Sequence, residues 1–215
     1  RIGGSVAAFD HFYLPDLHDA GVVAPNVDDI GWARQAKGGF VLNPKVGVHP
    51  NVLVMDFKSL YPTVIRTFLI DPLSRFQRHI DPLKTPVGLT FSRTHHILPG
   101  KISELLERRT QAKKEKNANL SQAVKILMNS FYGVMGSSGC RFYQEDLPDG
   151  ITGSGQWILK TVIEFLEGKG FAVLYGDTDS LFVQLPTYDN YNDQAKKLVN
   201  DCLLYTSPSP RDLST

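Results

Sequence analysis

The sequence has very little cysteine: Cys140 and Cys202 are the only two among 215 residues. Two cysteines are too few for a disulfide framework or for a cysteine-ligated metal site. No apolar run approaches the roughly 18 residues that cross a bilayer, and the N-terminus has no basic-then-apolar signal pattern. We therefore expect a protein without a membrane span, in a reducing, cytoplasmic compartment.

The chain also lacks a large excess of either charge, since 23 Lys and Arg oppose 22 Asp and Glu. Its 42% hydrophobic and 21% charged residues are ordinary globular values, which exclude collagen-like and disordered classes. The charge is unevenly placed, however, because residues 101–125 hold seven basic and only three acidic side chains. Three carboxylates, Asp56, Asp177 and Asp179, stand at the ends of apolar runs, an unusual place for solvating charge.

Short apolar strands and amphipathic helices alternate along the predicted chain. Residues 1–50 show no sustained period, so irregular structure is expected there, with one strand at 39–42. Four prolines favour a connecting segment at 72–100. The remaining patterns predict strands at 51–57, 171–175 and 181–185, and helices at 60–70, 101–116, 119–132 and 151–167.

The helices at 101–116 and 119–132 are close enough in sequence to form an antiparallel hairpin. Asn119 is expected to cap the second helix, with Gln122 three residues later as its return partner.

The first chemical constellation is Asp56-Phe-Lys-Ser-Leu-Tyr-Pro, where a buried strand turns into a helix. A strand holds such a carboxylate rigidly, and backbone N–H groups near a helix N-terminus can face an anion. The alternative is that Asp56 only caps the helix.

The second constellation is Tyr175-Gly-Asp-Thr-Asp-Ser, at the turn of a predicted hairpin. Two carboxylates two residues apart are hard oxygen ligands that suit Mg²⁺. An EF-hand is not expected, because strand continues where further ligands and a glycine should stand. An ordinary Asp-rich turn and the Asp-x-Asp metal site of a glycosyltransferase stay open as alternatives.

The third constellation lies on the predicted helical hairpin. Lys125, Asn129 and Tyr132 share one helix face, and Arg109 and Lys113 form an i, i+4 pair on the preceding helix. Such bases can hold a triphosphate, although a solvated charged face is the simpler interpretation. Together with the two carboxylate sites, they supply the parts of two-metal phosphoryl transfer.

In order along the chain, DFKSLYP, KILMNSFYG and YGDTDS resemble the three polymerase motifs of family B DNA polymerases. Within that family, KSLYPTVIRTFLIDP is most similar to the bacterial DNA polymerase II type. The resemblance implies an α+β fold: a mainly antiparallel palm sheet with packed helices and an inserted antiparallel helical hairpin, the fingers. The implied segments are 1–100 (first part of the palm with an irregular lead-in and connector), 101–135 (fingers) and 136–201 (second part of the palm).

The resemblance also implies a role for each matching residue. Asp56 and Asp179 are expected to bind two Mg²⁺ ions, with the Phe57 carbonyl assisting and Asp177 in support. The residues implied to bind the incoming dNTP are Ser59 and Leu60 through backbone N–H groups, Tyr61 as a steric gate under the sugar, Arg109, Lys113 and Lys125 at the phosphates, and Asn129 and Tyr132 at the nascent base pair.

Two further positions concern DNA. Gly38-Gly39 is similar to a short motif that approaches the template strand. Gln156 departs from the family, which often has Arg or His at that place for a contact with the DNA backbone.

The implied activity is DNA-directed DNA synthesis, in which the primer 3′-OH attacks the α-phosphate of a dNTP and pyrophosphate leaves. The implied partners are primer-template DNA, a dNTP and, through regions outside this chain, a sliding clamp. A non-catalytic nucleic-acid or nucleotide-binding module and a metal-dependent glycosyltransferase are the alternatives.

The sequence has no Asp-x-Glu exonuclease motif before Asp56 and no candidate thumb after the hairpin, so we expect a fragment. Residues 202–215, from Cys202-Leu-Leu-Tyr-Thr-Ser-Pro onward, are similar to a translated sequencing-library adapter. The natural sequence is therefore expected to end near Asp201, and the alternative is a natural, disordered end rich in Ser and Pro.

Overall fold

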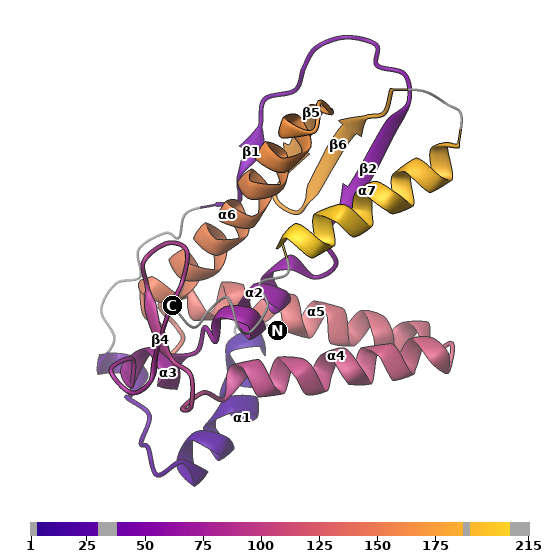
Figure 1. Ribbon diagram of the computed structural model, residues 1–215. Helices are drawn as coiled ribbons and strands as arrows, with labels where there is room; N and C mark the ends of the chain where they lie inside the picture. Colours follow the sequence, from indigo (N-terminus) through magenta and orange to yellow (C-terminus); the bar gives the residue numbers. More distant parts are fainter. Residues whose placement is uncertain (1–3, 30–37, 187–189, 207–215) are drawn as a thin grey trace. The chain divides into compact units, whose positions relative to one another are not determined.

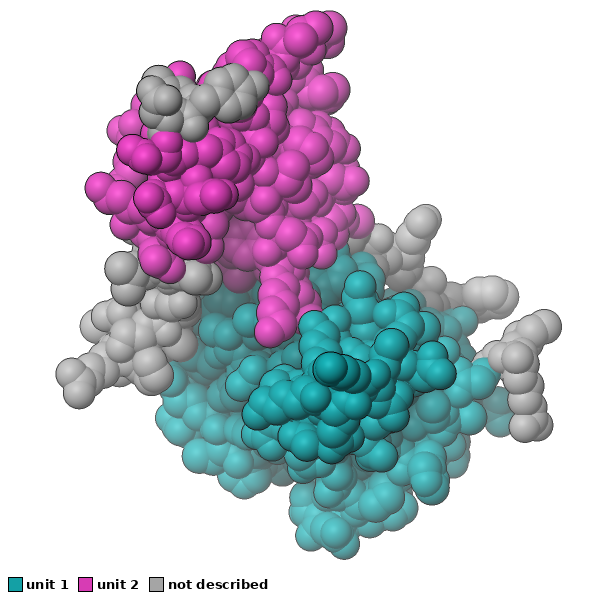
Figure 2. Space-filling view, turned by 90° about the vertical axis from the view of Figure 1, so that its right-hand side faces the viewer, with its two compact units in different colours: residues 1–37, 61–154 teal, residues 38–60, 155–215 magenta. Residues whose placement is uncertain are grey.

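The computed structural model describes residues 4–29, 38–186 and 190–206. The chain divides into two compact units, coloured separately in Figure 2. Unit 1 comprises residues 1–37 and 61–154, and unit 2 comprises residues 38–60 and 155–215. The chain passes between the units three times, so neither unit is continuous in sequence.

Unit 2 is built on a four-stranded antiparallel sheet with strand order β1-β5-β6-β2. Its strands are Val41–Leu42 (β1), Val52–Asp56 (β2), Ala172–Asp177 (β5) and Ser180–Gln184 (β6). The four strands coincide closely with the predicted ones, because β-branched and apolar residues dominate each run.

The two faces of this sheet differ in chemistry. Met55, Leu181 and Val183 point to one face, where they join the hydrophobic core of the unit. Side chains of directly paired residues share a face, so the pairs Val54–Phe182 and Asp56–Ser180 point the other way. Val54 is 55% exposed, which marks that second face as accessible.

Two helices contribute further residues to the unit 2 core and cover its apolar sheet face (Figure 1). They are the later turns of α6 (Asp146–Gly168), through Leu159, Val162 and Leu166, and α7 (Tyr191–Thr206), through Leu198 and Cys202. The predicted helix at 151–167 is confirmed as part of α6. α7 continues to Thr206, beyond the expected natural end near Asp201, and residues 207–215 of the suspected adapter lie outside the described residues.

Unit 1 is mainly helical. Its elements are α1 (Gly4–Asp19), a short 3₁₀ helix at Val27–Asp29, α2 (Leu60–Phe68, which starts at the unit boundary), α3 (Pro72–Phe76), the strand pair β3 (Pro82–Lys84) and β4 (Thr90–Ser92), α4 (Leu98–Lys114), α5 (Ala118–Met135) and the first turns of α6. α4 and α5 lie side by side as the predicted helical hairpin (Figure 1).

The predicted cap of the second hairpin helix was wrong by two residues. Asn117, not Asn119, is the N-cap, and its Oδ1 accepts a hydrogen bond from the Leu120 N–H at 3.0 Å. The helix therefore begins at Ala118 and places Asn119 in its first turn.

Two segments expected to be irregular contain regular structure. In residues 1–50, α1 forms because Phe9, Tyr13 and Leu17 recur every four residues on one buried face. Pro15 inside the helix obscured this pattern. In residues 72–100, α3 and the β3–β4 hairpin occupy much of the expected connector.

Asp71 joins three parts of unit 1. Its fully buried carboxylate accepts hydrogen bonds from the Tyr13 hydroxyl at 2.9 Å, from the Leu98 N–H at 2.7 Å and from the Ser74 N–H at 2.9 Å. Burial raises the pKa of Asp71, while these donors act in the opposite direction. The carboxylate thus caps α3 and ties α1 to the start of α4.

Cys140 and Cys202 are buried and form no disulfide, and burial raises the pKa of each thiol to about 11. Within the described ranges, no helix is long and apolar enough to cross a membrane.

Candidate active site

A row of polar side chains crosses the accessible sheet face at one end of unit 2. Asp56 on β2 pairs with Ser180 on β6, and Ser180 pairs with Asp177 on β5. Since neighbouring strands lie about 4.8 Å apart, the backbones of Asp56 and Asp177 are separated by about 10 Å across β6. Both carboxylates are exposed.

Asp179 lies in the turn that connects β5 to β6, next to this row. Its carbonyl oxygen accepts a hydrogen bond from the Phe57 N–H at 2.7 Å. That bond continues the β2–β6 pairing by one step beyond Asp56. The end of the strand that carries Asp56 and the turn that carries Asp179 therefore meet, although they lie more than 120 residues apart in sequence.

The oxygen atoms available where the end of β2 meets the β5–β6 turn suit a hard divalent cation. Carboxylate and carbonyl oxygens are the ligands that Mg²⁺ prefers, and Mg²⁺ is commonly held by one or two carboxylates together with substrate phosphates. Among the described residues, no group of three or more His, Cys, Asp or Glu side chains gathers closely enough to hold a metal without substrate. The carboxylates and carbonyl at the Phe57–Asp179 junction therefore suit a metal site in which substrate phosphates provide some of the ligands, rather than one in which the protein provides all of them.

The backbone after Asp56 leads directly into α2. Phe57 packs against the unit 2 core, and Ser59 adopts a positive φ of 54° immediately before the first helical residue, Leu60. The N–H groups of Ser59 and Leu60 stand at the N-terminus of this nine-residue helix, where the helix dipole favours an anion.

In unit 1, the structure brings together two of the predicted nucleotide-binding residues. The rings of Tyr61 on α2 and Tyr132 on α5 have centroids 4.8 Å apart and are tilted by 44°. Burial raises the pKa of the Tyr132 phenol, and the Asp149 carboxylate raises it further. The phenol is therefore uncharged at neutral pH and can act as a hydrogen-bond donor.

The remaining predicted residues of unit 1 lie on the helical hairpin. Arg109 and Lys113 are one turn apart on α4, and Lys125 and Asn129 are one turn apart on α5. Lys113, Lys125 and Asn129 are exposed, and Arg109 is partly buried. The predicted i, i+4 spacings are confirmed as helical.

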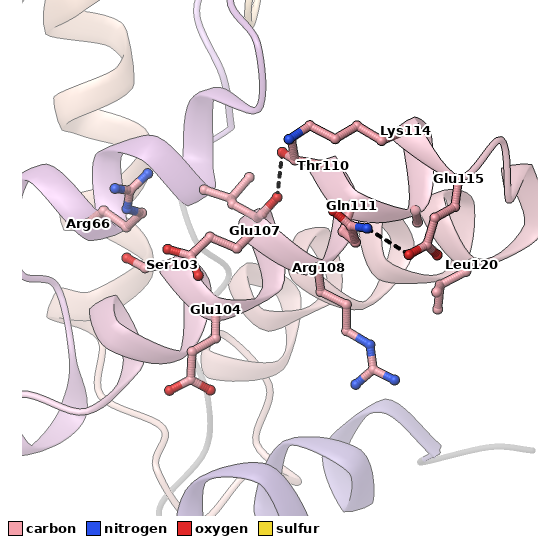
Figure 3. Close-up of a pocket in the computed structure, with 12 residues that line it drawn as sticks. Arg66, Ser103, Glu104, Glu107, Arg108, Thr110, Gln111, Lys114, Glu115 and Leu120 are labelled. Carbon is pink, nitrogen blue, oxygen red and sulfur yellow. Dashed lines mark hydrogen bonds between the residues drawn. The ribbon is translucent and has the colours of Figure 1, made fainter.

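A hollow of about 760 Å³ lies elsewhere on the hairpin (Figure 3). Its lining includes Arg66, Glu107 and Lys114, and a hydrogen bond from Gln111 to Glu115 lies at its rim. None of the predicted nucleotide-binding residues lines it, and its acidic and basic side chains are mixed. We assign it no role.

Gly38 and Gly39 lie in unit 2, just before β1. The Gly38 carbonyl accepts a hydrogen bond from the Gln156 amide at 2.8 Å, and Gly39 lies against Thr178. Thr178 was not among the predicted site residues. The signal that could have revealed it is a β-branched residue at a two-residue hairpin turn, where Gly or Asn is favoured.

The described residues thus contain both a carboxylate-bearing antiparallel sheet and a basic helical hairpin, the two features that the polymerase motifs led us to expect. The family profile described as DNA polymerase family B matches residues 5–204. The chain belongs to DNA polymerase family B.

Individual relatives agree with this assignment. DNA polymerase II of Escherichia coli (strain K12) is 43% identical over 201 residues, which cover 91% of this chain and 26% of that protein. A DNA polymerase of Thermococcus gorgonarius is 32% identical, covering 90% of this chain and 27% of the relative. The family B DNA polymerase structure from Pyrobaculum calidifontis matches with a TM-score of 0.65 and 29% identity, covering 87% of this chain and 27% of that one.

These findings confirm the predicted family and the predicted α+β fold class. The chain spans about a quarter of the length of these relatives.

Proposed function

We propose that this chain is the palm and fingers part of a DNA-directed DNA polymerase, which transfers a nucleotide from a dNTP to a primer 3′-OH. One observation supports this most strongly: the Phe57–Asp179 hydrogen bond joins the strand end bearing Asp56 to the turn bearing Asp179. Family B motifs occupy both places, and the donor chemistry is that of two-metal phosphoryl transfer.

In this proposal, Asp56 and Asp179 hold two Mg²⁺ ions, aided by the Phe57 carbonyl, while Asp177 supports the site from the adjacent strand. The ions supply Lewis-acid charge at the attacking and leaving oxygens when they are bound. The protein's own contribution is rigid placement, because β2, β5 and β6 hold the backbones of the carboxylates in register.

The nucleotide is proposed to meet residues from α2, α4 and α5. The N–H groups of Ser59 and Leu60 face the triphosphate, and Arg109, Lys113 and Lys125 neutralise its charge. The Tyr61 ring closes the space that a 2′-OH would need. Asn129 and Tyr132 contact the nascent base pair, and Gly38 and Gly39 approach the template.

Several further expectations remain predictions. They are the division at 1–100, 101–135 and 136–201, the adapter origin of 202–215, the cytoplasmic location and the sliding clamp as a partner of regions outside this chain. Primer-template DNA and a dNTP are the substrates that the family implies.

The test is Mg²⁺-dependent primer extension by the protein expressed from the complete reading frame that contains this chain. We expect Asp179→Ala to lower kcat by at least about a hundredfold, because charge stabilisation at the transferred phosphate is lost. Asp193→Ala, which removes an exposed carboxylate from the first turn of α7, is the matched control and should leave the rate unchanged.

Unaltered extension by the Asp179→Ala variant would refute the site assignment. DNA and dNTP binding without any extension by the unmodified protein would instead favour the non-catalytic binding module.

A further inference from the structure

The turn between β5 and β6 has a backbone conformation that its sequence disfavours. Thr178 has a φ of +52°, and the Asp179 N–H donates to the Asp177 carbonyl across it. This is the pattern of a γ-turn with positive φ, a rare and strained form. A β-branched residue in this region is an outlier that persists only when its surroundings hold it in place.

The surroundings that hold Thr178 come from the segment Gly38–Phe40. The Thr178 N–H donates to the Phe40 carbonyl at 2.9 Å. A Cβ on Gly39 would lie 2.6 Å from the Thr178 Oγ1, and Gly39 itself has no positive φ. Glycine is therefore needed here for space against Thr178 rather than for backbone conformation.

The same contact orients a carboxylate of the candidate site. With its backbone fixed by Phe40, Thr178 donates its hydroxyl to the Asp177 Oδ1 at 2.9 Å. This bond constrains the direction of the Asp177 carboxylate, although Asp177 itself is exposed.

Helix α6 also contacts the Gly38–Phe40 segment. The Gln156 Nε2 donates to the Gly38 carbonyl at 2.8 Å, and the Lys160 ammonium lies 5.2 Å from the centroid of the Phe40 ring. Gln156 and Lys160 are one helical turn apart, so a single face of α6 reaches both ends of the segment.

We propose that Gly38–Phe40 is a brace that holds the β5–β6 turn in its strained form, with Gln156 and Thr178 as positioning residues for the carboxylates of Asp177 and Asp179. Gln156 acts through Gly38 and Thr178 acts directly on Asp177. The proposal rests on the proposed polymerase site, and it gives Gln156 an internal partner at the position where the family often has a cation.

The first experiment measures amide hydrogen exchange in the β5–β6 turn of the protein from the complete reading frame. Thr178→Val keeps the shape and removes the hydroxyl, and Gln156→Met keeps the length and removes the donor. We expect each to speed exchange of the Thr178 and Asp179 amides about fivefold, the equivalent of one ordinary hydrogen bond. Thr178→Ser should restore slow exchange, and Glu164→Gln, an exposed change on the same helix, should have no effect.

The second experiment measures the Mg²⁺ concentration that gives half-maximal primer extension. A positioning role predicts that Thr178→Val and Gln156→Met raise this concentration about threefold or more, since a misdirected carboxylate binds more weakly. Simple loss of fold stability would lower the active fraction without changing this concentration. Thr178→Ser should again behave like the unmodified protein.

Gly39→Ala separates the brace from a template contact. In a Thr178→Ala background, Gly39→Ala should add little to the exchange already seen with Thr178→Ala alone, because the Oγ1 and Cγ2 atoms that crowd the new methyl group are then gone. Weaker DNA binding by Gly39→Ala with unchanged turn exchange would overturn the brace.

Failure of this inference is distinguishable from failure of the proposed function. Slow turn exchange and an unshifted Mg²⁺ requirement in Thr178→Val, within a protein that extends primers, overturn the brace alone. Absence of extension by the unmodified protein overturns the function, while the exchange measurement still decides whether the brace exists.

Discussion

At the residue scale, two aspartates near helix α2 show that the surroundings of a carboxylate determine its role. Asp56 ends a strand on an accessible sheet face, whereas Asp71 is fully buried and accepts hydrogen bonds from Tyr13, Ser74 and Leu98. Local sequence shows both only as carboxylates at the ends of elements. Burial and long-range donors separate a candidate metal ligand from a structural anchor.

The Asp71 anchor leads to a stability prediction. Asp71→Ala should lower the free energy of unfolding of the chain by about 3 kcal/mol or more, because it leaves buried donors unpaired. Tyr13→Phe removes one of those donors, but it also removes the acceptor of the buried Leu73 N–H, at 3.1 Å, and should cost about 2 kcal/mol. Urea denaturation measures both values.

Asp28→Ala, at an exposed position of the short 3₁₀ helix, is the control and should change the unfolding free energy little. Equal effects of Asp71→Ala and Asp28→Ala would show that the buried carboxylate does not anchor unit 1.

At the element scale, the start of α5 gives a second prediction. Asn117→Ala removes the side-chain acceptor for the Leu120 N–H and should destabilise the chain by about 1 kcal/mol. Asn119→Ala, in the first turn of the same helix, loses no cap and should be neutral or slightly stabilising, since Ala is the better helix former. Thermal unfolding of the two variants distinguishes them, and a larger loss for Asn119→Ala would contradict the cap assignment.

Helices and strands that depend on neighbouring residues could be predicted from the sequence, whereas those that depend on distant contacts could not. β2, β5 and β6 were predictable because short β-branched runs end at clear turn signals, and the α4–α5 hairpin was predictable from helical periodicity. Both α1 and α7 were missed. α1 depends on distant aromatic partners such as Phe131 and Phe142, and no local pattern contains them.

The candidate site was predictable only in part for the same reason. The motifs identified Asp56, Asp177 and Asp179, and strand pairing now joins their backbones. The contacts of Thr178 with Phe40 and of Gln156 with Gly38 span more than 100 residues and depend on tertiary packing.

At the scale of the whole molecule, the near-neutral net charge conceals an uneven distribution of charge between the two units. Unit 2 carries the three carboxylates of the candidate site, and unit 1 carries the basic hairpin. The even balance of 23 basic and 22 acidic residues is thus a cancellation between two local fields of opposite sign.

Because the chain covers only part of its relatives, we can predict how residues 1–215 behave when they are expressed alone. Phosphate contacts dominate affinity for duplex DNA, and this chain spans about a quarter of the related polymerases. We predict that residues 1–215 alone extend primers weakly or not at all, and that any DNA binding falls steeply with added salt. Filter binding and primer extension at two salt concentrations test this, and robust processive synthesis would contradict it.

The interleaving of the two units constrains how the protein is made. β1 and β2 leave the ribosome before their strand partners in the described sheet, β5 and β6, which follow after the 115 residues between Asp56 and Ala172. At ordinary rates of translation the delay is on the order of ten seconds. During that time the two outer strands of the described sheet are synthesised but not yet paired with β5 and β6, while the helices of unit 1 can already pack. The carboxylates of Asp56, Asp177 and Asp179 are therefore brought together only after those helices have been made.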